Sequence, residues 1–464
     1  MPDPPPEKDM RKTLRTLAAL VLLSIAAIAQ TSDATLRRIT DVDRASRDAS
    51  GKLPVLSAAE HLSRAETYMA NRLFPQAREH WAIVLEKYPE DPGVSKALFG
   101  TARSYMWERD YQKAVEWFDR LTKDYLMTKD GREGLAFKGA SYVRMGKNLE
   151  AVKAYEQYTI AFPEGERIES AYLNIIDALR EAGKYDDAEQ WVEKTVSKFA
   201  GKPSEVNALH AQLRMEIHRE HWSDAVSAAD RLLSGKSFTG TMASFDEVKY
   251  LRAFAISMDK RANSASVFAS ILPNPTSYYA GLAAERVSGS NVKLIADVTP
   301  KYYSDYPVMF RTEVVRESKK RNIDPRFLLA IMKQESSFKP SAKSPAGARG
   351  LLQLVFDTAL KYNVSAGFPN VQPDDLYDPA TNIAIGSEYI KFLKDEFGGL
   401  YEGIAASYNG GEDNALRWLN RSKPKEPGIF TSEIGFAESK NYVFKVMTNY
   451  RIYRELYTEN LDRK

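Results

Sequence analysis

The chain has 464 residues, with 65 Lys and Arg side chains against 62 Asp and Glu side chains, for a formal net charge of +3. So small an excess argues against a dedicated nucleic-acid-binding protein, which usually concentrates basic residues on one face. A hydrophobic fraction of 44% and a charged fraction of 27% are ordinary for globular proteins and argue against wholesale disorder and a polytopic membrane protein. Because there is no cysteine, disulfides, thiolate metal sites and cysteine nucleophiles are excluded. No histidine follows His221, so chemistry in the second half must run without imidazole.

The amino-terminal segment has the pattern of a secretory signal. Arg11, Lys12 and Arg15 precede an uncharged apolar run over residues 17–29, which ends in a small-x-small cleavage pattern. At 1.5 Å per residue this run spans about 20 Å, too short for a hydrocarbon core of about 30 Å. We therefore expect a cleaved signal peptide at residues 1–29 and no stable membrane anchor after cleavage. The alternative is an uncleaved anchor, and Met10 is a candidate translation start.

Small and aromatic residues then recur with a period of 37 residues. The small residues are Ala77, Ala114, Ala151, Ala188 and Ala225. Three residues before them lie Phe74, Tyr111, Asn148, Tyr185 and Trp222, and four residues after them lie Trp81, Phe118, Tyr155, Val192 and Ala229. Eleven residues after the first four alanines lie Tyr88, Tyr125, Phe162 and Phe199. An alanine lets two helices approach closely, a large residue one turn later fills the space beside it, and the closing aromatic marks the end of the second helix.

This pattern resembles the tetratricopeptide repeat, and a weaker sixth unit is expected around Ala265. It predicts a mostly α-helical protein whose amino-terminal part is an α-superhelix over residues 58–272, after a linker at residues 30–57. The superhelix serves either as a scaffold whose aromatics are all core or as a concave surface for a protein partner or a polymer. His218 and His221 fall in a turn between expected helices without a carboxylate pattern around them, so we expect no metal site there.

A single carboxylate stands out in the second half. Asp324-Pro325 is typical of a helix start and predicts a helix running to about Phe338. Leu328, Ile331 and Met332 mark its apolar face, and Glu335 follows on the same face. Burial raises the pKa of a carboxyl group, and a carboxylic acid that stays protonated near neutral pH suits a general acid. The alternative is a structural acid paired with a base such as Arg349.

The residues around Glu335 form an ordered set of short motifs. They are Gln334-Glu335-Ser336-Ser337-Phe338, Ser344-Pro345-Ala346-Gly347-Ala348, Gly350-Leu351-Leu352-Gln353, Asp378-Pro379, Asn382-Ile383, Gly386, Tyr389-Ile390, Ser407-Tyr408-Asn409-Gly410-Gly411, Trp418, Glu438-Ser439-Lys440 and Tyr442-Val443. In this order the set resembles the catalytic domain of soluble lytic transglycosylases, which has a lysozyme-like fold, and it covers about residues 309–460. The stretch from Tyr278 to Ala284 is similar to the linker helices of the same enzymes. We expect linker helices at residues 273–308 and the lysozyme-like domain at residues 309–464.

The resemblance implies a lytic transglycosylase that cleaves the β-1,4 bond between N-acetylmuramic acid and N-acetylglucosamine in peptidoglycan and leaves 1,6-anhydro ends. It implies that Glu335 acts as general acid and then as base, without a cofactor or metal, in the periplasm. The substrate-binding residues it implies are Gln353, Tyr408, Asn409, Glu438 and Ser344. Tyr408 is expected to form a hydrogen bond near Glu335.

Some of these residues also have structural interpretations. Asn409 and Ser344 are common loop formers. Trp418, Tyr377 and Tyr389 either stack on sugar rings or pack in the core, and core packing is favoured.

The chain departs from the family pattern at several positions. Leu352 stands where the family usually has Met, Val355-Phe356 where it has Met-Pro, Ser407 where it has Ala, and Ser439 where it has Thr. The first two put the shape of the sugar subsites in doubt.

Two other functions remain open at this point. The first is a muramidase-type hydrolase, which needs a second carboxylate, for which Asp357, Asp374, Asp375 and Glu388 are available. The second is a non-catalytic peptidoglycan-binding scaffold, which the departure at Phe356 motivates.

Overall fold

The computed structural model describes residues 34–259, 264–271, 274, 276–288, 295 and 297–464. The predicted signal peptide at residues 1–29 lies outside these ranges. Within them the regular structure is helical, and the only β pairing consists of isolated bridges such as Lys343 with Arg349. No helix in the described ranges combines the length and the apolar character that crossing a bilayer requires.

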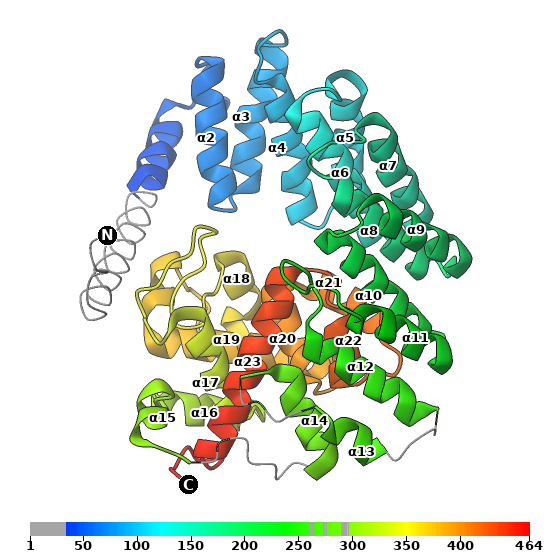
Figure 1. The fold of residues 1–464 in the computed structure, drawn as a ribbon. Coiled ribbons are helices and arrows are strands. Elements are labelled where there is room, and N and C mark those ends of the chain that lie inside the picture. Colours follow the sequence, from blue (N-terminus) through cyan, green and yellow to red (C-terminus); the bar gives the residue numbers. More distant parts are fainter. Residues whose placement is uncertain (1–33, 260–263, 272–273, 275, 289–294, 296) are drawn as a thin grey trace, which may run out of the picture.

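The first half is a series of antiparallel helices that curves into an arch (Figure 1). A helical segment over residues 34–46 comes first. It is followed by α2 (Ala58–Ala70), α3 (Phe74–Lys87), α4 (Val94–Trp107), α5 (Tyr111–Tyr125), α6 (Lys129–Arg144), α7 (Asn148–Ala161), α8 (Ile168–Glu181), α9 (Tyr185–Lys198), α10 (Pro203–His218), α11 (Trp222–Leu233), α12 (Phe245–Met258) and α13 (Ser264–Ala269). Consecutive helices pack against each other along this series, so the superhelix of tetratricopeptide-like hairpins predicted from the sequence is present.

The 37-residue period sets where each second helix begins. Helices α3, α5, α7, α9 and α11 each start at the residue three positions before a repeat alanine. All five repeat alanines are fully buried. Tyr88, Phe162 and Phe199 cap the carboxyl ends of their helices, and Tyr125 is the last residue of α5. Close packing also explains Gly139 of α6, because a Cβ atom there would lie 2.6 Å from the Tyr155 ring.

The sixth unit differs from the expectation. Helix α13 is only 6 residues long, and Ala265 is exposed rather than held between two helices. Phe268, one turn later, is the buried residue of this helix. The array therefore ends in a short helix that lacks the small inter-helix residue of the five regular units.

The second half is a helical domain under the arch (Figure 1). Its helices are α14 (Tyr278–Ser288), α15 (Pro300–Asp305), α16 (Arg311–Arg321), α17 (Pro325–Ser336), α18 (Phe356–Ala366), the 3-10 helix η2 (Pro373–Tyr377), α19 (Pro379–Glu396), α20 (Tyr401–Gly410), α21 (Glu412–Arg421), α22 (Pro427–Ser432) and α23 (Ala437–Leu456). The long helix α23 packs against both α17 and α20, and α20 also packs against α21. This arrangement brings the end of α17 and the end of α20 to the same side of the domain.

Buried charges join the two halves. Glu433, after α22, accepts hydrogen bonds from Arg180 of α8 at 2.7 Å and from Arg214 of α10 at 2.8 Å, and its side chain is 1% exposed. Burial alone would raise the pKa of Glu433, but the arginines, including Arg421, lower it to about 2. A second contact lies at the far end of the arch, where Arg72 pairs with Asp357 at 2.6 Å. Charged contacts thus hold the helical domain at separated places along the arch.

Candidate active site

Helix α17 begins as its sequence indicates and ends abruptly after Glu335. The Asp324 carboxylate caps the helix by accepting from the backbone N–H of Arg326 at 2.9 Å. The helix ends at Ser336, two residues before the expected end, because Ser337 (φ 49°) and Phe338 (φ 62°) adopt left-handed backbone conformations. Such conformations cost about 1 kcal/mol or more in residues other than glycine. The sharp turn leaves Glu335 in the last helical turn.

Glu335 lies at the rim of the domain core. The three apolar residues before it on the same face, Leu328, Ile331 and Met332, are fully buried, whereas the Glu335 side chain is partly exposed. The Tyr442 hydroxyl of α23 donates a hydrogen bond to Glu335 Oε1 at 2.6 Å. Desolvation raises the pKa of Glu335 to about 7, and this hydrogen bond opposes the rise. The carboxyl group therefore exists in both protonation states near neutral pH.

The structure does not show the alternative role of Glu335, in which it would be a structural acid paired with Arg349. The Arg349 guanidinium donates to the Gly347 carbonyl at 2.8 Å. No arginine or lysine of the described ranges is among the groups that move the Glu335 pKa. Glu335 is instead a partly desolvated acid whose neighbours are apolar side chains and a tyrosine.

The expected hydrogen-bond role of Tyr408 belongs to another tyrosine. The Tyr408 hydroxyl donates to the Leu352 carbonyl at 2.6 Å and so anchors the loop just before α18. Tyr408 is still close to the acid, because the Glu335 charge adds to burial in raising the Tyr408 pKa. The residue that contacts Glu335 is Tyr442, which lies one helical turn after Glu438 on α23. That spacing was visible in the sequence, but the approach of α23 to α17 was not.

Gln353 and Ser344 belong to the loop between α17 and α18. Gln353 has a left-handed backbone (φ 46°), and its side-chain NH₂ donates to the carbonyls of Ala342 at 3.0 Å and Gly350 at 2.8 Å. These bonds fix the amide, and its carbonyl oxygen has no hydrogen-bond partner among the described residues. The Ser344 hydroxyl accepts from the backbone N–H of Ala348 at 3.1 Å, which is a loop-forming interaction.

Asn409 and Glu438 lie at the surface where α20 ends and α23 begins. The Asn409 side-chain oxygen accepts from the Ser439 hydroxyl at 2.7 Å and so ties the two helices together. The neighbouring Glu438 is exposed, in the first turn of α23. Of the expected substrate residues, Tyr408 is thus beside the acid, while Asn409 and Glu438 lie at the same helix ends farther out.

The four carboxylates considered for a hydrolase are all engaged elsewhere. The pairs are Asp357 with Arg72, Asp374 with Arg37, Asp375 with the backbone N–H of Gln372, and Glu388 with Arg321. None of the four is among the groups that move the Glu335 pKa. Among the described residues, no carboxylate therefore contributes to the raised pKa of Glu335.

The departures from the family pattern at Leu352 and Phe356 lie in or against the core of the helical domain. Leu352 is fully buried against Gly386, where a Cβ atom would lie 2.4 Å from it. Phe356, the first residue of α18, is partly buried and packs on the core. Trp418 and Tyr389 are also buried, which confirms core packing for these two aromatics.

Carboxylates do flank the turn between α10 and α11, contrary to the sequence-based expectation. His221 lies 2.9 Å from Glu216 and 3.9 Å from Asp224. Arg219 already pairs with Glu216 at 3.2 Å, and the Nδ1 atom of His218 lies 2.8 Å from the Arg421 carbonyl oxygen. The separation of five residues between Glu216 and His221, across the helix end, hid this cluster from the sequence pattern.

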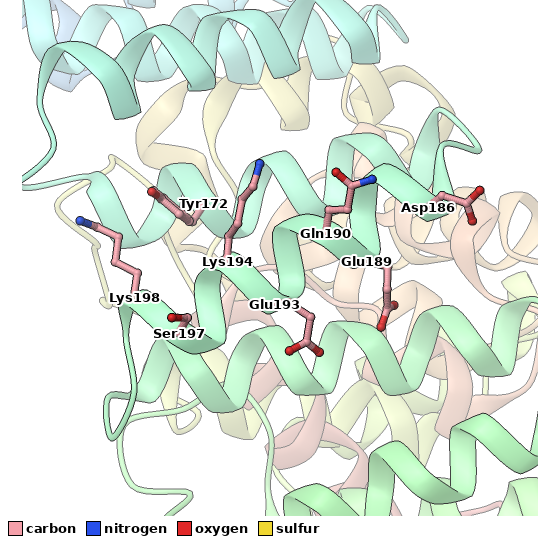
Figure 2. Close-up of a pocket in the computed structure, with 8 residues that line it drawn as sticks. All are labelled: Tyr172, Asp186, Glu189, Gln190, Glu193, Lys194, Ser197 and Lys198. Carbon is pink, nitrogen blue, oxygen red and sulfur yellow. The ribbon is translucent and has the colours of Figure 1, made fainter.

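A cavity of about 830 Å³ lies on α8 and α9, in the superhelix. Figure 2 shows Tyr172 of α8 near the lysines of α9, Lys194 and Lys198, while the acidic side chains, among them Glu189, lie toward the start of α9. It contains none of the residues expected in the site, and its open, mixed-charge lining is typical of a solvated helix face.

The comparisons with known proteins match the superhelix and the helical domain separately. The family model of the transglycosylase SLT domain matches residues 314–430, and a tetratricopeptide repeat model matches residues 62–125 and 138–203. The chain combines tetratricopeptide repeats with a transglycosylase SLT domain.

Curated relatives match about a third of the chain. Soluble lytic murein transglycosylases of Salmonella typhimurium and Escherichia coli K12 are 31% and 32% identical over 151 residues, which is 32% of this chain. The match spans only 23% of the length of each of these relatives. Membrane-bound lytic murein transglycosylase C of Salmonella arizonae is 33% identical over 164 residues, with coverage of 30% of this chain and 45% of that protein.

A solved structure extends the likeness to most of the fold. The lytic transglycosylase Slt of Pseudomonas aeruginosa, solved as an inactive mutant, has a TM-score of 0.51 at 16% identity. The match covers 85% of this chain and 79% of that one. The fold is therefore a tetratricopeptide-like superhelix followed by a lysozyme-like α-helical domain.

Proposed function

We propose that this protein is a lytic transglycosylase of peptidoglycan. In this proposal it cleaves the β-1,4 bond between N-acetylmuramic acid and N-acetylglucosamine and leaves a 1,6-anhydromuramoyl end. The observation that carries the proposal is a single carboxyl group, Glu335, with a pKa raised to about 7 and no second carboxylate acting on it among the described residues. The SLT match over residues 314–430 supplies the reaction class.

One carboxyl group can serve both steps of such a reaction. Protonated Glu335 gives its proton to the glycosidic oxygen as the bond from C1 of the muramoyl unit breaks. The resulting carboxylate then takes the proton of the C6 hydroxyl as O6 attacks C1 and closes the ring. The attacking group belongs to the substrate itself, so its effective concentration is high, and no water is consumed. This differs from most glycosidases, which use two carboxyl groups.

The neighbouring side chains fit these steps. Tyr442 holds one oxygen of Glu335, which leaves the other oxygen to carry the proton. Tyr408 supports the loop before α18 through its hydrogen bond to the Leu352 carbonyl. Gln353, Asn409 and Glu438 are proposed to contact the N-acetyl sugars, and Ser344 to shape the loop that faces them. Peptidoglycan glycan strands are the proposed substrate, and the periplasm is the proposed compartment. A further proposal is that the superhelix binds a protein partner.

The test is digestion of purified sacculi with the mature protein, with released muropeptides identified by mass spectrometry. Glu335→Gln should yield no products, and the wild type should yield anhydromuramoyl ends. Glu402→Gln is a matched control, because Glu402 is also desolvated, also bonded to a tyrosine (Tyr278, at 3.1 Å), and also has a pKa raised to about 7. This control should keep full activity.

Each other result has a defined meaning. Reducing-end products from the wild type would identify a hydrolase. Binding to sacculi without any product would identify a recognition module. Equal loss of activity in both variants would remove the assignment of Glu335 as the acid, since the effect would then follow from altered buried charge in general.

A further inference from the structure

A cavity of about 740 Å³ lies between the superhelix and helix α21 of the SLT domain. On the superhelix side it is lined at the ends of the repeat helices, including Tyr111, Arg144 and Tyr185, and on the other side by residues of α21, including Asp413 and Arg417. Its volume is typical of cavities that hold small ligands. Neither half of the chain could form it alone.

One cation in this cavity lacks an acidic partner. The carboxylates in the lining are engaged: Glu181 with Arg417 at 2.7 Å and Arg421 at 3.1 Å, and Asp413 with Arg109 at 3.3 Å. Arg144 forms no ion pair with any described residue, and its contact is with the ring of Tyr111, 5.9 Å from the ring centre. An uncompensated guanidinium in a recess is costly unless something anionic joins it.

The surroundings of Arg144 add to this cost. Burial lowers the Arg144 pKa and the charge of Arg417 lowers it further, while Tyr111, Tyr155 and the more distant Asp413 oppose them without restoring the ordinary pKa. Glu181 already holds Arg417, whereas Arg144 has no ion-pair partner among the described residues. Its guanidinium therefore suits an incoming carboxylate, which it can hold through two hydrogen bonds.

The cavity is connected to the candidate active site by direct contacts. Helix α21 follows α20 after the single residue Gly411. Glu412 accepts a hydrogen bond from the Tyr389 hydroxyl, and the Tyr389 ring lies 5.3 Å from the ring of Tyr408, the residue beside Glu335. The helix that lines the cavity is therefore linked through side-chain contacts to the tyrosine beside Glu335.

We propose that this cavity binds a free carboxylate of a peptidoglycan stem peptide, with Arg144 as its main anchor. The inference rests on the proposed function for the identity of the ligand, because stem peptides are the carboxylate-bearing branches of that polymer. It adds a peptide-recognition role for the superhelix to the sugar-recognition role of the SLT domain. The superhelix then discriminates strands that carry peptides from strands that have lost them.

The test is calorimetric titration of the full chain with the free tetrapeptide L-alanyl-γ-D-glutamyl-meso-diaminopimelyl-D-alanine. Arg144→Gln should weaken binding at least about tenfold, the loss expected for a charge-assisted hydrogen bond. Arg103→Gln is the matched control. Arg103 also lies against aromatic rings, has no ion pair with a described residue, and is outside the cavity. This control should bind as the wild type does.

A second arm needs no variant. The same peptide with its carboxylates amidated should not bind the wild type. Equal affinity for Arg144→Gln and the wild type, retained binding of the amidated peptide, or failure of the wild type to bind the tetrapeptide would each overturn the proposal. Because the titration involves no turnover, its result can be interpreted even if the protein releases no anhydro products. Anhydro products without peptide binding would overturn this inference alone.

The kinetic signature separates anchoring from structural support. On peptide-bearing strands, Arg144→Gln should raise KM and leave kcat unchanged. On strands stripped of peptide by an amidase, it should match the wild type. A fall in kcat on both substrates would show that Arg144 supports the fold of the site instead.

Discussion

The raised pKa of Glu335 implies a measurable stability cost. The pKa moves from an ordinary value of 4.5 to about 7 on folding, and each pH unit of difference corresponds to about 1.4 kcal/mol. Below pH 4.5 the carboxyl is protonated in both the folded and the unfolded chain, so folding carries no ionisation cost. Between pH 4.5 and 7 the unfolded chain ionises and the folded one does not, so the free energy of unfolding falls as pH rises. Above pH 7 the loss levels off at about 3 kcal/mol.

Glu335→Gln removes this ionisation and should therefore reveal the cost. The variant should gain stability over the wild type progressively between pH 4.5 and 7, by up to about 3 kcal/mol, with a constant difference above that range. Urea unfolding at a series of pH values measures it. Glu402→Gln should show the same profile while keeping activity. A difference between Glu335→Gln and the wild type that does not change with pH would refute the argument that Glu335 is desolvated.

Three further outcomes follow from contacts in the structure. Tyr442→Phe removes a hydrogen bond that favours the charged form of Glu335, so the fall of kcat/KM with rising pH should move upward by about one pH unit, as a pH–rate profile would show. Glu433→Gln leaves buried arginines uncompensated and should lower the free energy of unfolding by about 3–5 kcal/mol at pH 7. The difference from the wild type should shrink as pH falls from 4.5 toward 2, because the wild type loses its own Glu433 charge there. Urea unfolding measures this difference, and a value that stays constant across that pH range would contradict the prediction. Gly139→Ala places a methyl group against the Tyr155 ring and should cost about 1–3 kcal/mol, and an unchanged unfolding midpoint would speak against the packing described.

Local patterns in the sequence predict the fold well wherever one period governs packing. The repeat alanines located the start of every second helix, because a small residue is needed wherever two helices cross closely. The spacing of Leu328, Ile331 and Met332 likewise placed Glu335 on the buried face of α17. In both cases the determining contacts lie within a few residues or one repeat.

The features that the sequence does not predict depend on contacts between distant segments. Tyr442 is 107 residues from Glu335, and Tyr408, nearer in sequence, is used by Leu352 instead. The partners of Glu433 lie 219 and 253 residues away. Neither pairing follows from local periodicity, because each depends on how whole helices dock. The cavity at Arg144 likewise depends on how the superhelix docks against α21.

The central claim is that a single carboxyl group completes the reaction with a nucleophile from the substrate. The most direct measurement is digestion of sacculi in water enriched in oxygen-18, with products read by mass spectrometry. The account expects muramoyl ends that are one water lighter than reducing ends and carry no label. Reducing ends that carry one labelled oxygen would show that water attacks C1, and would contradict the account.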